Sequence, residues 1–235
     1  MTAARRAHLE TVTAITRTWD IVVFLAGMAE TACVQALIAA GRRFYARNWV
    51  LATSGNFSVV TSVSPLRLLI TQSGVHKGAL TARQFLTIDA NGQPTGRTKA
   101  RPSAEARLHV EIVEARGAGA VLHTHSVWST VLSVRHGAAG GIAIQGLEML
   151  KGLDGVTTHT HREWVPIVDN DQDMTRLRGV VGQLLHDSPA IHGFLLRGHG
   201  LYTWGRTVAD AERHVETLEF LFQVIGERHE PDPHS

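Results

Sequence analysis

The order of the predicted secondary-structure segments is the feature that most limits the folds open to this chain. Short β-rich runs alternate with amphipathic helical stretches, and no internal repeat or Pro-, Gly- or Ser-rich linker divides them. A hairpin signal, Asn91-Gly92, argues against an all-parallel sheet. The sequence therefore predicts one α/β domain over residues 31–230, with a mixed, largely antiparallel central sheet covered by helices on both faces.

Apolar periodicity and turn residues place the individual elements. Helices are expected over residues 31–48, 103–116, 128–136, 172–186 and 207–228. Strands are expected over residues 57–63, 67–71, 85–89, 120–125, 142–145, 164–168, 194–196 and 201–204. Ser103 and Thr207 are predicted N-caps, and Asp210 in the first turn would complete the second cap.

Composition limits the partners and the compartment. The formal net charge of +2 and the scattered basic residues favour neither nucleic acid nor membrane as a partner. A single cysteine, Cys33, excludes an internal disulfide framework and fits a reducing, cytoplasmic location. The longest apolar run, Ile21 to Ala29, is too short to cross a bilayer and is interpreted as a buried helix segment. Residues 1–30 are expected to be an N-terminal extension, and Met28 is a possible alternative start.

Two histidines separated by one residue, His123 and His125, are the first candidate metal ligands. In a strand, residues two apart point to the same face, so both imidazoles can reach one ion. Neutral imidazole suits Zn²⁺, and a catalytic zinc has three protein ligands and one open position. The same spacing recurs at His159 and His161, and strand histidines are also satisfied by ordinary hydrogen bonds. Spacing alone leaves the choice open.

A third candidate ligand, His199, lies between two apolar strand-like runs. Its neighbours Gly198 and Gly200 are small enough to allow close approach to a ligand. A turn histidine without a partner is the alternative interpretation. Together with one of the two pairs, His199 would complete a three-imidazole site.

Two glycine-bearing loops indicate an anion site. Their backbone N–H groups, hydroxyls, amide and lysine can surround a phosphate, and Ser103 lies at a predicted helix N-terminus, which also favours phosphate. The candidate residues are Ser54, Gly55, Asn56, Ser73, Gly74, Lys77 and Ser103. Each is also compatible with an ordinary turn or cap. The nucleotide-binding patterns GxxxxGK[ST] and GxGxxG are absent from the sequence.

Glu105 and Glu148 are the candidate catalytic carboxylates. Glu105 falls in the first turn of a predicted helix, where it could simply interact with the helix dipole. Glu148 lies among small and apolar residues, and partial burial there would raise its pKa enough for proton transfer near neutral pH. The alternative is a surface glutamate paired with Lys151 three residues later.

Taken together, residues 31–228 resemble the class II aldolase/adducin-type family. The general motifs are Thr53-Ser54-Gly55-Asn56, Gln72-Ser73-Gly74, Pro102-Ser103-Ala104-Glu105, His123-Thr124-His125-Ser126 and His199-Gly200. A dehydratase branch of the family is indicated by three longer motifs. These are Gly146-Leu147-Glu148-Met149-Leu150-Lys151-Gly152, the segment from Trp164 to Asn170, and the segment from Arg197 to Gly205.

The resemblance implies one zinc ion per subunit held by His123, His125 and His199, rather than by His159 and His161. It implies a phosphate site in the glycine loops, Glu148 as the acid/base, and a homotetramer with active sites near subunit boundaries. In the sugar-phosphate aldolases of the family, the glutamate matching Glu105 serves as base and can touch the metal. Glu105 is therefore a fourth ligand, a substrate contact or a helix cap.

The implied reaction is the removal of water from a small phosphorylated keto-sugar. Zn²⁺ on the ketone oxygen would stabilise the charge that develops when a neighbouring proton is removed. Glu148 would take that proton and help a hydroxyl to leave. Aldol cleavage of a fuculose- or rhamnulose-phosphate type substrate is the alternative reaction, and a non-catalytic adducin-like interaction module is the alternative from another class.

Overall fold

The structure, a computed structural model, describes residues 30–228. Its central element is an eight-stranded sheet. The strands are β1 (Asn56–Val63), β2 (Leu66–Thr71), β3 (Phe85–Asp89), β4 (Ala120–Thr124), β5 (Gly141–Ile144), β6 (Glu163–Val168), β7 (Gly193–Leu196) and β8 (Gly200–Gly205). Their spatial order is β3-β2-β1-β4-β8-β7-β6-β5, and every neighbouring pair is antiparallel except β6 and β7. The predicted mixed, largely antiparallel sheet is confirmed.

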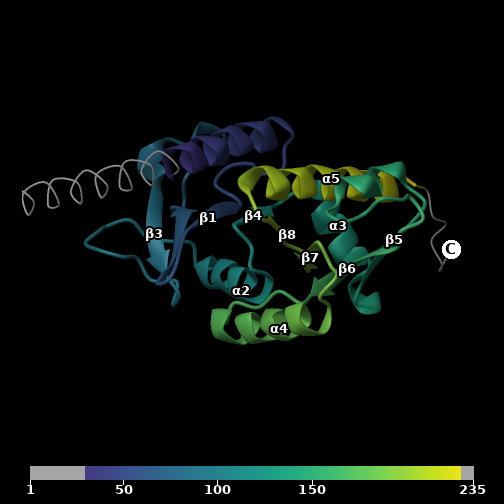
Figure 1. The fold of residues 1–235 in the computed structure, drawn as a ribbon. Coiled ribbons are helices and arrows are strands. Elements are labelled where there is room, and N and C mark those ends of the chain that lie inside the picture. The colour runs from purple at the N-terminus through teal and green to yellow at the C-terminus, as the bar shows by residue number, and fades with distance from the viewer. Residues whose placement is uncertain (1–29, 229–235) are drawn as a thin grey trace, which may run out of the picture.

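Helices cover both faces of the sheet (Figure 1). They are a helix over residues 30–46, α2 (Ala106–Arg116), α3 (Val127–Arg135), α4 (Met174–Asp187) and α5 (Val208–Glu227). Helices α2 and α4 pack on one face, and the helix over residues 30–46 packs with α5 on the other. Helix α3 packs against α5. A short 3₁₀ helix, η4 (Glu148–Gly152), precedes β6 and also contacts α5.

Strand β4 shows how the alternating pattern sorts side chains between the two faces. Val121 packs in the apolar cluster formed with α2 and α4. Ala120 and Leu122 pack in the cluster formed with the helix over residues 30–46 and α5. Because successive strand residues point to opposite faces, His123 lies on the α2 side and Thr124 on the α5 side. Both faces of β4 are therefore buried, and its polar residues must find partners inside the protein.

The observed elements follow the sequence-based expectations closely, with two corrections. Helix α2 begins at Ala106 rather than at Ser103, and Glu105 occupies the N-cap position without a side-chain cap hydrogen bond. The Asn91-Gly92 turn forms, but the returning segment makes only the isolated bridge between Ile88 and Pro94 instead of a strand. Proline has no N–H to donate, so a ladder does not continue there.

The predicted cap of the last helix is confirmed. The Thr207 hydroxyl accepts a hydrogen bond from the Asp210 backbone N–H at 3.1 Å, and the Asp210 carboxylate accepts one from the Thr207 N–H at 3.2 Å. The expected helix segment Ile21 to Ala29 and nearly all of the expected extension lie outside the described residues. Within residues 30–228, no helix combines the length and apolarity needed to cross a bilayer.

Candidate metal centre and anion cavity

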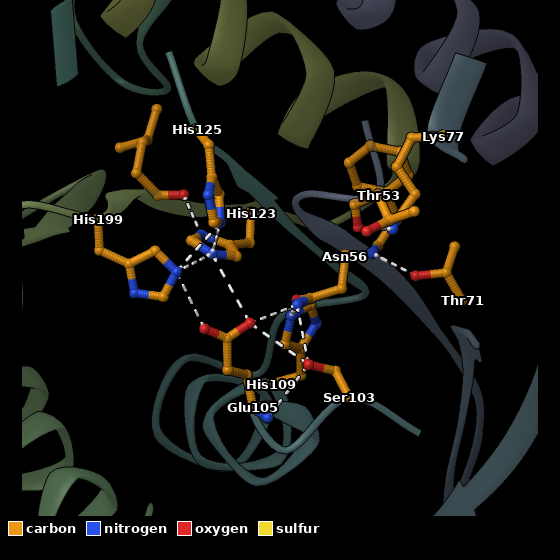
Figure 2. Close-up of polar contacts among 12 residues, drawn as sticks. Thr53, Asn56, Thr71, Lys77, Ser103, Glu105, His109, His123, His125 and His199 are labelled. Atoms are coloured by element: carbon orange, nitrogen blue, oxygen red, sulfur yellow. Dashed lines mark hydrogen bonds and ion pairs between the residues drawn. The ribbon is translucent and has the colours of Figure 1, made fainter. Parts of the chain in front are cut away.

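Three histidine side chains converge beside the central strands (Figure 2). His123 lies in β4, His125 follows the end of that strand, and His199 lies in the turn between β7 and β8. The Nε2 atoms of His123 and His125 are 2.8 Å apart. The Nε2 atom of His199 lies 3.3 Å from that of His123 and 3.1 Å from that of His125. Strand alternation and one tight turn thus bring together residues 76 positions apart.

The two distances to His199 are close to those of a metal site, and the distance between His123 and His125 is shorter. Three nitrogens bound tetrahedrally to Zn²⁺ at about 2.0–2.1 Å would lie about 3.3 Å from one another. The Nδ1–H of His123 donates to the Leu201 carbonyl at 2.8 Å, which leaves the Nε2 lone pair for a metal. Such an outer hydrogen bond fixes both the tautomer and the direction of the ring.

The electrostatics also fit neutral imidazole ligands. Burial, followed by the proximity of His125 and His199, holds the pKa of His123 well below its ordinary 6.5. Burial, followed by the proximity of His199 and Lys77, lowers the pKa of His125 to about 4. Within the described part of the chain, this is the only group of at least three His, Cys, Asp or Glu residues whose possible ligand atoms all lie within 4.8 Å of one another.

Two glycines allow neighbouring backbone segments to approach β4 closely. A Cβ atom at Gly200 would lie 2.0 Å from the carbonyl oxygen of Thr124 and 3.2 Å from the His123 ring. A Cβ atom at Gly55, whose φ is +72°, would lie 2.5 Å from the carbonyl oxygen of His123. Both contacts are to backbone atoms that cannot rotate away, so both positions require glycine.

Glu105 stands at the N-cap position of α2, and its carboxylate points towards the histidines. Its Oε1 is 3.2 Å from Nε2 of His199, and its Oε2 is 3.8 Å from Nε2 of His123. The amide of Asn56 donates to Oε2 at 2.6 Å. This carboxylate makes no cap hydrogen bond, so Glu105 does not cap α2 through its side chain, and a contact with metal or substrate stays a prediction.

A buried hydrogen-bond chain behind Glu105 fixes its orientation. His109 is fully buried, and burial lowers its pKa to about 3, so the ring is neutral. Its Nε2 contacts Oδ1 of Asn56, and its Nδ1 lies 2.7 Å from the Ser58 hydroxyl. If Nε2–H donates to Asn56, then Nδ1 accepts from Ser58, and the Asn56 amide N–H points at Glu105. His109 follows Glu105 by one helical turn, a spacing that could have revealed it in the sequence.

The two glycine loops meet Glu105 and two of the histidines around a cavity of about 190 Å³. The cavity is lined by Thr53, Ser54, Gly55, Asn56, Gln72, Ser73, Gly74, Lys77, Ser103, Glu105, His125 and His199. All seven residues expected at the anion site are therefore brought together beside the histidine cluster. Thr53 and Gln72 line the cavity in addition to the residues expected from the sequence.

Lys77 connects the two loops. Its side chain is buried, and its ammonium group donates to the carbonyl of Thr53 at 2.7 Å and to that of Val75 at 2.8 Å. Burial lowers its pKa to about 8, while the charge of Glu105 acts in the opposite direction. An ammonium has three donors, so one N–H remains for an anion in the cavity.

Glu148 lies elsewhere in the described chain. It does not line the cavity, its side chain is 72% exposed, and it pairs with Lys151 at 2.5 Å. The hydrogen bond from Lys151 lowers its pKa, so the partial burial and raised pKa expected from the sequence are absent within a single chain. His159 lies 3.7 Å from the same carboxylate.

His161 belongs to a separate buried network that the sequence did not indicate. Its Nε2 lies 2.8 Å from the buried carboxylate of Glu163, which also contacts His192 at 3.1 Å. Neither His159 nor His161 approaches the three-histidine cluster.

Tyr202 is a further residue of the centre that sequence reasoning missed. Its ring stacks on His123 with centroids 3.9 Å apart, and its side chain is fully buried. Burial, and then the charge of Glu105, raises the pKa of Tyr202 well above 10. It is paired with His123 across β8 and β4, a relation that requires the strand register.

Comparison with known proteins shows the family to which this chain belongs. A family model described as "Class II Aldolase and Adducin N-terminal domain" matches residues 35–225. A methylthioribulose-1-phosphate dehydratase of Serratia proteamaculans is 47% identical over 86% of this chain and 97% of its own length. A second one, of Sorangium cellulosum, is 42% identical over 79% of this chain and 87% of its own length.

Solved structures show the same fold. The l-fuculose-1-phosphate aldolase from Thermus thermophilus superposes with a TM-score of 0.65 at 25% identity, covering 83% of this chain and 94% of its own. YgbL from Klebsiella pneumoniae, described as a putative aldolase/epimerase/decarboxylase, gives a TM-score of 0.72 at 22% identity, covering 86% and 92%. The chain belongs to the class II aldolase and adducin family. It is an enzyme of the lyase class.

Proposed function

We propose that this enzyme removes water from 5-methylthioribulose 1-phosphate to give 5-methylthio-2,3-dioxopentyl phosphate, a step of methionine salvage in the cytoplasm. The observation that carries the proposal is the three-histidine cluster at the edge of a cavity lined by two glycine loops. Relatives 42–47% identical over most of the chain bear the name of this dehydratase. The cluster suits a Lewis acid, and the loops suit the phosphate of a keto-sugar phosphate.

We propose Zn²⁺, one ion per subunit, as the metal held by His123, His125 and His199. Their short separations and depressed pKa values support this donor set. When bound, the ion supplies Lewis-acid stabilisation of the charge that develops on the substrate ketone. Glu105 is a catalytic residue that contacts the metal or the substrate, and its contact with His199 supports either role.

The phosphate would lie between the glycine loops. Backbone N–H groups near Gly55 and Gly74, the hydroxyls of Ser54, Ser73 and Ser103, and the amide of Asn56 are the proposed donors. Lys77 adds the only positive charge among the side chains that line this cavity. Held there, the phosphate would orient C3 and C4 of the substrate for reaction.

We propose that Glu148 reaches this centre from a neighbouring copy of the chain, in a homotetramer. Glu148 is exposed in the single chain and lies outside the cavity, which supports a role across a subunit boundary. Helix α3 follows His125 directly and exposes three valines at i, i+4 and i+7: Val127, Val131 and Val134. Such an apolar stripe is suited to contact between subunits.

In the proposed reaction, Glu148 takes the C3 proton and delivers it to the C4 hydroxyl, which leaves as water. The electron pair of the C3–H bond forms the C3–C4 double bond as the C4–O bond breaks. The enol that results then tautomerises to the 2,3-diketone. One carboxylate thus acts first as base and then as acid.

The test combines metal content with product analysis. His199→Ala should lose both metal and activity, whereas Glu148→Gln should lose turnover and keep metal and substrate binding. Wild-type activity in Glu148→Gln would contradict the role of this carboxylate. The structural similarity to an l-fuculose-1-phosphate aldolase makes aldol cleavage the second candidate. Incubation with methylthioribulose phosphate and with fuculose or rhamnulose phosphate separates the two, because dehydration yields a diketone and cleavage yields an aldehyde.

A further inference from the structure

A carboxyl group lies in the protein core on the far side of the ligand strand. Glu219 belongs to α5, which packs against β4, and the residue is only 2% exposed. Its Oε1 accepts a hydrogen bond from the Thr124 hydroxyl at 2.8 Å. Thr124 stands between His123 and His125, with its side chain on the opposite face of β4. Glu219 therefore contacts the ligand segment from behind.

Glu219 breaks the apolar pattern of its helix. Val215, Leu218 and Phe222 on α5 are fully buried and apolar, as a helix packed on a sheet requires. Burial raises the pKa of Glu219 to about 7, although hydrogen bonding by Ser126 and Thr124 acts in the opposite direction. A carboxyl group buried in the core makes the protein less stable than an apolar side chain of similar size would at the same position. Exceptions of this kind concentrate where a protein needs them for function.

The two hydroxyl residues near Glu219 lie directly before and after His125. The Ser126 hydroxyl oxygen accepts the Ser129 N–H at 2.9 Å as the N-cap of α3, which fixes the chain directly after His125. The pairing of β4 with β8 ends at Thr124. His125 lies beyond this ladder, and its position depends on its neighbours and on one backbone hydrogen bond to Trp49.

We propose that Glu219 is a positioning residue of the metal centre, which anchors Thr124 and thereby holds the adjacent His125 in register with His123 and His199. The inference rests on the proposed function, because it supposes a divalent metal on the three imidazoles. Residues that orient metal ligands in this way typically change metal affinity or activity by about 10–100-fold when they are replaced.

The experiment measures metal binding by the full-length protein. Metal-free protein is titrated with Co²⁺, whose visible absorption reports the geometry of its ligands, and Zn²⁺ affinity is measured by competition with a chelator. Glu219→Leu should weaken metal binding about tenfold or more and alter the Co²⁺ spectrum. Glu219→Gln keeps an oxygen that can accept from Thr124 and should retain most of the affinity. Thr124→Val, which removes only the hydroxyl, should weaken binding in the same direction.

Thr217→Val is the matched control, because Thr217 is equally buried on α5 but lies against Gly152 of η4 instead of β4. It should leave the affinity and the Co²⁺ spectrum unchanged. A folded Glu219→Leu protein with wild-type affinity and spectrum would overturn the inference. If Glu219→Leu does not fold, Thr124→Val decides, and wild-type metal binding in that variant would overturn it. A wild-type protein that takes up no metal would instead overturn the proposed metal centre, and this inference with it.

Discussion

A mixture of two inactive variants tests whether Glu148 acts on the metal centre of a neighbouring chain. His199→Ala removes a proposed metal ligand but keeps Glu148, and Glu148→Gln removes the proposed acid/base but keeps all three histidines. Each variant alone should be inactive. In a mixed oligomer, a complete site forms wherever an intact cluster on one chain meets an intact Glu148 on a neighbouring chain.

The fraction of wild-type activity expected in the mixture follows from the location of Glu148. This residue is 72% exposed and does not line the cavity, so the expected site draws its two parts from two chains. With equal amounts and random assembly, half of the chains supply the cluster and half of their neighbours supply the carboxylate. About a quarter of the sites are then complete, and about a quarter of the wild-type activity should return.

The assay is dehydratase activity after co-expression of the two variants with different affinity tags, which allows mixed oligomers to be isolated. Co-expression of His199→Ala with a chain carrying both substitutions is the control, because no neighbour then offers an intact cluster. That control should stay inactive. Purified mixed oligomers of the two single variants that show no activity would refute the proposal that Glu148 works between chains.

Three further predictions concern substitutions within one chain. His109→Phe leaves two buried polar partners unsatisfied and should lower the free energy of unfolding, measured with denaturant, by about 2–6 kcal/mol; no loss would contradict the buried chain behind Glu105. Because burial lowers the pKa of Lys77 to about 8, its charge is present below that pH and absent above it. Phosphate affinity, followed by calorimetry, should therefore fall as the pH rises through about 8 in wild type but not in Lys77→Met, and a flat wild-type profile would argue against this contact. Gly200→Ala places a Cβ atom 2.0 Å from a backbone oxygen and should destabilise the protein by about 1–3 kcal/mol. Gly179→Ala, whose added Cβ atom would meet nothing within 4 Å in α4, should instead stabilise the protein by about 1 kcal/mol. Thermal unfolding measures both variants, and equal effects of the two substitutions would refute the steric argument.

Local patterns in the sequence were enough to place the elements of the fold. Alternation placed β4, and the Thr207 cap with Asp210 placed the start of α5, because both depend on residues close in the chain. Ser103 was misplaced as a cap since any serine before a helical run gives the same local signal. The backbone instead begins its helix at Ala106, which leaves Glu105 free to turn towards the histidines.

Beyond the fold, the sequence by itself determined which side chains could act: an imidazole pair with a period of two, two glycine loops and two carboxylates. Only the tertiary structure decided which of them meet. The register of β4 with β8 places His199 against His123, and packing of α2 places Glu105 and His109 behind them. Contacts of this kind join residues tens of positions apart. They form only when the strands assemble into the sheet, with glycine where backbone segments lie closest to β4. The same tertiary structure leaves Glu148 exposed, outside the site that its sequence motif suggested.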